Sequence, residues 1–268
     1  MNQFYAILND PQVAALFKSG GLLLARILPI IILTPMLGGN LLPRRLRIGV
    51  SMLLVLALLP ALSPATLAAA NITGVSYLVY FGKELLIGLT MAKMIDLLYQ
   101  TFVSFGAIVD LSRGATIASV YDPVTQRQQS ILGLFFLPCG IVLFLVLGGH
   151  LVVIEAFADS LATLPPTELL PARLQGETAV TQILVLFAQM LIVAVKLSAP
   201  VLAVILLVDV VLGLLNRVAP QVQVYFLGLT AKSFVGLLIL FLSLLVVMDL
   251  FGEHMRTVLR VIQEWISG

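Results

Sequence analysis

Charged side chains are scarce in this sequence of 268 residues. Asp, Glu, Lys and Arg make up 10% of it, whereas apolar residues make up 60% and the mean hydropathy is +1.13. About a quarter of the residues in an ordinary soluble domain are charged, so this chain lacks the polar residues that would cover a water-facing surface. The composition therefore excludes a soluble globular protein and predicts that lipid is the main solvent.

Residues that hold metals or carry nucleophilic catalysis are also rare. The sequence has one cysteine, Cys139, and two histidines, His150 and His254, and none of them belongs to a metal-binding spacing. A single cysteine forms no disulfide within its own chain. Neither a Walker motif nor the G-x-S-x-G motif of hydrolases is present. We therefore expect no enzymatic activity, no metal and no cofactor.

A strong net charge is absent as well. The formal net charge is +2 and no basic tract is interleaved with aromatic residues, so nucleic acid is not an expected partner. The length suits a bundle of about six membrane helices with roughly 20 apolar residues each. We predict an all-α integral membrane protein of about six long, kinked apolar helices, arranged as hairpins in one polytopic domain, residues 1–268.

Long apolar runs fill most of the chain. Prolines inside them, among them Pro138 and Pro200, predict bends because each removes a backbone hydrogen bond. Residues 252–268 alternate charged and apolar side chains, which is typical of a short amphipathic helix. The apolar runs cover residues 20–42, 48–62, 77–121, 130–154, 178–215 and 222–251.

Several charged residues lie inside these apolar runs. A charge at the centre of a membrane helix costs about 2.5–3.5 kcal/mol, so each is expected to have a partner or to face a wet cavity. Lys93 and Asp96 are three residues apart and share a helical face, and so do Asp110 and Arg113. Such pairs are either structural or mark a region that faces other subunits or an aqueous path. Further candidates for intramembrane or intersubunit ion pairs are Arg26, Lys83, Glu84, Lys196, Asp209, Arg217 and Lys232.

Three motifs occur in order along the chain. Lys83-Glu84-Leu85-Leu86-Ile87-Gly88 lies in the third apolar run, and Ile108–Thr116 is followed by Asp122-Pro123. Arg217-Val218-Ala219-Pro220-Gln221 follows the fifth run. With the basic turn at Pro43–Arg47, these motifs resemble the FliR/SctT family (YscT and SpaR among its names), the export-gate membrane proteins of type III secretion systems. The central motif is more similar to the virulence, or injectisome, branch than to the flagellar branch.

The resemblance implies a multi-pass protein of the bacterial inner membrane. It implies assembly with SctR-like and SctS-like subunits, with SctU-like and SctV-like proteins nearby, around a conduit for unfolded protein substrates. It also implies a plug that obstructs the closed channel, shaped by Asp110, Arg113, Gly114, Asp122 and Pro123. Turn or packing roles are implied for Pro43, Arg47, Pro200, Gly213, Pro220 and Gln221.

Three other functions are alternatives to an export gate. A stand-alone secondary transporter would use the intramembrane ion pairs as a proton or substrate relay, but the sequence shows no clear inverted repeat. A membrane-embedded enzyme is disfavoured because no nucleophile, metal set or acid–base pair has a workable spacing. A scaffold subunit without any gating role is the third alternative.

Overall fold

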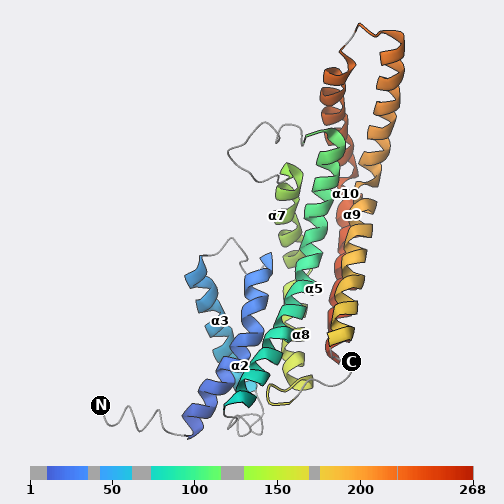
Figure 1. The fold of residues 1–268 in the computed structure, drawn as a ribbon. Helices are drawn as coiled ribbons and strands as arrows, with labels where there is room; N and C mark the ends of the chain where they lie inside the picture. The colour runs from blue at the N-terminus through green and yellow to red at the C-terminus, as the bar shows by residue number, and fades with distance from the viewer. Residues whose placement is uncertain are drawn as a thin grey trace. The chain divides into compact units, whose positions relative to one another are not determined.

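All regular secondary structure in the described part of the chain is helical. The computed structural model describes residues 11–35, 43–61, 74–115, 130–168, 176–221 and 223–267. This confirms the predicted all-α fold. The helices are α2 (Pro11–Leu33), α3 (Arg44–Leu58), α5 (Val75–Arg113), α7 (Ile131–Val146), α8 (Gly149–Thr163), α9 (Gly176–Val218) and α10 (Val224–Ser267), with the short 3-10 helix η2 (Leu59–Ala61) after α3 (Figure 1).

Four helices of the described residues are long and apolar enough to cross a membrane. They contain the candidate spans Val13–Leu33, Val75–Arg113, Val180–Val218 and Val224–Ile266. A fifth is possible if α7 and α8 form one broken span. The second apolar run of the sequence forms α3, whose 15 residues are too few for the roughly 30 Å hydrocarbon core. The described residues thus contain four or five candidate spans, in approximate agreement with the predicted number of about six apolar helices.

The chain divides into two compact units that are not successive stretches of sequence. The first unit comprises residues 1–96, 148–186 and 258–268, and the second comprises residues 97–147 and 187–257. The long helices α5, α9 and α10 contribute residues to both units.

The core of the first unit forms around α2. Buried residues recur on this helix at intervals of three and four, among them Leu22, Leu23, Ile27 and Ile30, as expected for one buried face of a helix. The backbones of α2 and α5 approach closely at Gly88, where an added Cβ would collide with the carbonyl group of Arg26. Helix α3 packs beside α2 (Figure 1).

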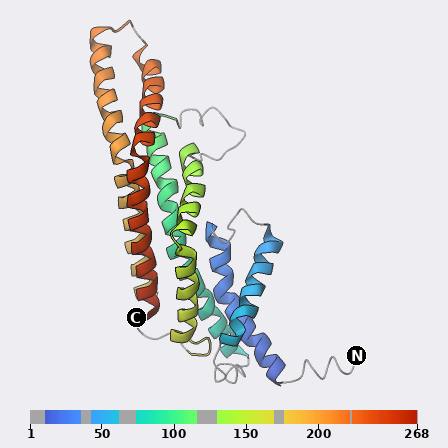
Figure 2. The same cartoon turned by 180° about the vertical axis from the view of Figure 1, so that it is seen from behind.

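The core of the second unit is aromatic. Tyr99, Phe102 and Phe105 follow one another at intervals of three along α5 and are fully buried. Their rings contact aromatic rings of α7 and α10, and α5 and α7 run side by side in both views (Figures 1 and 2). The ring centroids lie 5.6 Å apart for Tyr99 and Phe144, 5.0 Å for Phe105 and Phe136, and 3.7 Å for Phe102 and Phe251.

Residues 187–218 of α9 and 224–257 of α10 form an antiparallel hairpin in the second unit (Figures 1 and 2). The hairpin turns at Pro220 and Gln221, between helices of 43 and 44 residues. Residues 252–267 continue α10 without a break, so the amphipathic tail is the last part of this helix. Its apolar side chains, such as Val258 and Ile262, are buried, whereas Arg256 and Arg260 are exposed.

The contact between α5 and α7 offers a test of the packing. An added Cβ at Gly106 would collide with the backbone of Gly133, so Gly106→Ala is expected to lower the stability by about 1–3 kcal/mol. An added Cβ at Gly82, on the same helix, meets nothing within 4 Å, so Gly82→Ala should be neutral or stabilising by up to about 1 kcal/mol. The thermal unfolding midpoints of the detergent-purified proteins measure both effects. Equal midpoints for the two variants would contradict the close approach.

Candidate functional site

A buried ion cluster lies in the first unit, centred on Arg26. This residue is on the buried face of α2 and has no exposed surface, and neither has its partner Glu84 on α5. The Arg26 Nε donates to one carboxylate oxygen of Glu84, and Nη2 donates to the other at 2.9 Å. The pair is therefore bidentate, which is the strong geometry for an arginine and a carboxylate.

The same guanidinium group also holds the end of α8. Arg26 Nη1 donates to the carbonyl oxygen of Ser160 at 2.7 Å and to its hydroxyl at 3.1 Å, and Nη2 donates to the carbonyl of Leu164 at 2.7 Å. The last carbonyl groups of a helix have no partner within it and carry partial negative charge. Arg26 therefore donates hydrogen bonds both to the Glu84 carboxylate and to carbonyl oxygens at the carboxyl end of α8.

Lys83 adds a second cation to this helix end. Its Nζ lies 2.8 Å from Glu84 Oε1 and donates to the carbonyl oxygens of Pro165 and Glu168 at 2.9 and 2.8 Å. A third carbonyl, that of Pro166, lies at 3.3 Å. Two cations, one carboxylate and a set of carbonyl oxygens thus join α2, α5 and α8. The sequence indicated that Arg26 needs a partner, but neither Glu84 as that partner nor Ser160 could be identified from local spacing.

Asp110 forms the polar centre of the second unit. Its carboxylate pairs with Arg113 one turn later on α5, and both side chains are buried. The other oxygen accepts hydrogen bonds from the Ser130 hydroxyl at 2.6 Å and from the backbone N–H of Leu132 at 2.9 Å. Ser130 in turn caps α7 by accepting from Gly133 N at 2.8 Å. One carboxylate therefore connects the end of α5 to the start of α7.

Gly114 ends α5 in a way that only glycine adopts without strain. Its φ is +78°, in the left-handed region, and its N–H bonds to the carbonyl of Leu111 at 3.1 Å. The next N–H, of Ala115, returns to the carbonyl of Asp110 at 3.0 Å. Asp122 and Pro123, the other two predicted loop residues, lie outside the described residues.

Arg113 reaches the opposite helix at a position that sequence reasoning missed. An added Cβ at Gly236 of α10 would lie 2.6 and 2.8 Å from the Cδ and Cγ atoms of Arg113. The absent side chain at Gly236 thus leaves room for the arginine stem, which is only 5% exposed. A glycine in an apolar helix is too common a feature to have indicated this contact.

The remaining predicted ion-pair residues fall into three cases. Lys93 pairs with Asp96 at 2.7 Å on α5, where the Lys93 side chain is 47% exposed and the Asp96 side chain 11%. Asp209 pairs with Lys232 and joins the two helices of the hairpin. Lys196 and Arg217 are exposed on α9 and form no ion pair with another described residue.

Comparison with known proteins identifies the family. Residues 17–258 match the sequence profile of the bacterial export proteins, family 1. The chain belongs to this family. Relatives include the surface presentation of antigens protein SpaR of Shigella flexneri, 30% identical over 81% of each chain, and the Yop proteins translocation protein T of Yersinia pestis, 29% identical over 89% of this chain and 90% of the relative. The flagellar biosynthetic protein FliR of Pectobacterium carotovorum is 28% identical over 86% of this chain and 85% of the relative.

The recognition of the FliR/SctT family from its motifs is therefore confirmed. This bacterial export protein is a multi-pass protein of the inner membrane and a component of a type III secretion export apparatus. Among its described residues, no group of three or more His, Cys, Asp or Glu residues lies close enough to hold a metal ion.

The predicted turn and packing residues of this export protein occupy different kinds of position. Pro43 immediately precedes α3 and Arg47 lies in its first turns, with its carbonyl accepting from Ser51 Oγ at 2.8 Å. Pro200 lies inside α9, and Pro220 and Gln221 lie at the hairpin turn. Gly213 is exposed on α9, and an added Cβ there would meet nothing within 4 Å, so it does not pack against the described chain.

Proposed function

We propose that this chain is a core membrane component of a type III secretion export gate, where it helps to enclose and to plug the conduit for unfolded protein substrates. The observation that carries the gating role is the position of Asp110. Its carboxylate binds Arg113 at the end of α5 and Ser130 and Leu132 at the start of α7. Both ends of the connecting segment, residues 114–130, are thus held at one buried point, as the base of a plug requires.

The exposed charges of α9 support assembly with companion subunits. Every 20-residue window of Val180–Val218 contains Lys196 or Asp209, so this helix cannot cross the hydrocarbon core without carrying a charge. Asp209 is paired with Lys232, whereas Lys196 is exposed on the face opposite the buried residues Ala194, Leu197 and Val201. Contact with another subunit supplies the partner that lipid does not. SctR-like and SctS-like subunits are the proposed companions, and SctU-like and SctV-like proteins the proposed neighbours.

Shortening the connecting segment tests the plug. Deleting residues 117–126 while keeping Gly114 and Ser130 should open a leak, because the anchors at Asp110 remain but the obstruction between them is removed. The measurement is the ion conductance of the purified assembly in planar bilayers, which is expected to rise well above that of the unaltered assembly. A deletion of residues 65–70, in the uncharged connection after α3, serves as the matched control. A tight bilayer after the 117–126 deletion would show that this segment is no plug.

The composition of the purified particle separates the export gate from a stand-alone transporter. Native mass spectrometry after gentle extraction should show one defined assembly containing this chain and several copies of two smaller membrane proteins. A monomer or simple homodimer that survives the same extraction would favour the transporter.

A further inference from the structure

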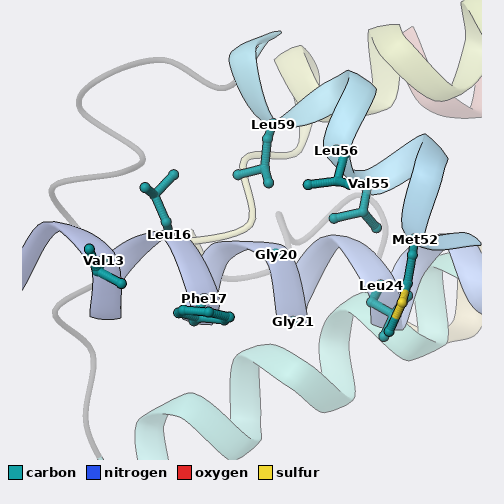
Figure 3. A pocket seen from close by; sticks show the side chains of 10 residues that line it. All are labelled: Val13, Leu16, Phe17, Gly20, Gly21, Leu24, Met52, Val55, Leu56 and Leu59. Atoms are coloured by element: carbon teal, nitrogen blue, oxygen red, sulfur yellow. The ribbon is translucent and has the colours of Figure 1, made fainter. Parts of the chain in front are cut away.

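An apolar groove runs between α2 and α3 in the first unit (Figure 3). Its volume is about 560 Å³, and all ten residues that line it are apolar or glycine. Phe17 on α2 and Met52 and Leu56 on α3 lie along it with 70%, 54% and 64% of their surface exposed. None of these ten described residues has a polar side chain that could hydrogen-bond to an occupant, so the groove suits a hydrocarbon chain.

The groove leads toward the basic turn of the protein. Arg45, Met52 and Leu59 are spaced at seven residues and therefore lie on one face of α3, and Met52 and Leu59 line the groove. Gly49 lies between Arg45 and Met52 on that face, and an added Cβ there would meet nothing within 4 Å. The open space at Gly49 thus lies between the groove and Arg45, and the side chain of Arg45 is exposed.

We propose that this groove binds the acyl chain of an anionic phospholipid whose phosphate group lies against Arg45 in the basic turn. The ten residue-to-residue steps from Gly49 to Leu59 rise about 15 Å along a helix, which matches half of the roughly 30 Å hydrocarbon core, the depth of one leaflet. Clusters of arginine beside a membrane helix attract anionic lipid headgroups. A helix of a companion subunit is the less favoured occupant, since the glycines of α2 that would allow close helix packing already face Val55 and Tyr77 of this chain.

The lipid content of the assembled, delipidated export complex tests the proposal. Phosphatidylglycerol and phosphatidylethanolamine with the same acyl chains are added separately, and bound lipid is counted by native mass spectrometry. Phosphatidylglycerol is expected to bind to the unaltered complex more tightly than phosphatidylethanolamine. Arg45→Gln should lower its occupancy about fivefold, in line with the loss of one cation beside an anionic headgroup. Inorganic phosphate alone should not compete, because the acyl chain supplies most of the binding.

Two further variants keep the result interpretable. Gly49→Phe fills the open space on α3 while keeping the charge of Arg45 and should also reduce bound phosphatidylglycerol, while Arg256→Gln, an exposed position of α10, should not. Because the complex must assemble before lipid is counted, loss of lipid from an intact complex is distinct from failure of the proposed gate. Equal lipid occupancy in Arg45→Gln, Gly49→Phe and the unaltered complex would overturn the proposal. So would efficient crosslinking of Met52→Cys or Leu56→Cys to a companion helix, which would show that protein fills the groove.

Discussion

Replacing Arg26 by methionine is expected to destabilise the protein by about 3–5 kcal/mol, because it removes one partner of a buried ion pair. The substitution keeps an apolar stem of similar length but leaves Glu84 with Lys83 alone. It also removes the Arg26 hydrogen bonds to the carbonyl oxygens of Ser160 and Leu164, of which the Ser160 carbonyl keeps the Leu164 N–H as a donor at 3.0 Å. The amount of chain in the membrane and the thermal midpoint of the purified protein should both fall steeply.

Two further substitutions, Arg26→Lys and Lys93→Met, provide the comparison. Arg26→Lys retains the charge but cannot contact both oxygens of Glu84 and the end of α8 at once, so it should recover only part of the stability. Lys93→Met removes an ion pair whose lysine is 47% exposed, and its expected cost is below about 1 kcal/mol. If Arg26→Met were as stable as Lys93→Met, the buried cluster would not hold the first unit together.

Replacing Asp110 by leucine is expected to raise the ion conductance of the assembled gate. The change breaks the buried pair with Arg113, at a cost of about 3–5 kcal/mol. It also removes the acceptor for Ser130 Oγ and the N–H of Leu132, so the end of α5 and the start of α7 lose their polar link. Conductance in planar bilayers reports the gate, and the thermal midpoint reports the fold.

A double variant separates these two effects. Asp110→Leu combined with Arg113→Leu removes both buried charges and should recover much of the stability, because an apolar pair can replace a buried ion pair at little cost. It does not restore the link to Ser130, so the leak should persist. Ser112→Ala is the matched control, since among the described residues the Ser112 hydroxyl donates to Ile108 O of its own helix and not to α7. Recovery of a tight channel in the double variant would show that stability, and not the link to α7, keeps the gate closed.

Local spacing was enough to predict some of the ion pairs in this protein. Lys93 with Asp96, and Asp110 with Arg113, are three residues apart, and helical geometry alone brings such residues together. The end of α5 at Gly114 also has a local explanation, because a helix often ends at a glycine in the left-handed conformation. Neither the hydrogen bonds from Ser130 and Leu132 to Asp110 nor the contact of Arg113 with Gly236 could be predicted in this way.

The sequence by itself determined the solvent, the class of fold and the family of this protein. So few charged residues leave lipid as the only compatible surroundings, and the long apolar runs form helices because each backbone group must be satisfied without water. Only the tertiary structure decided which charges on different helices meet. Arg26 and Glu84 are 58 residues apart, and Arg26 and Ser160 are 134 residues apart. The physical reason is that helical periodicity relates residues within one helix, whereas partners on different helices are chosen by how those helices pack.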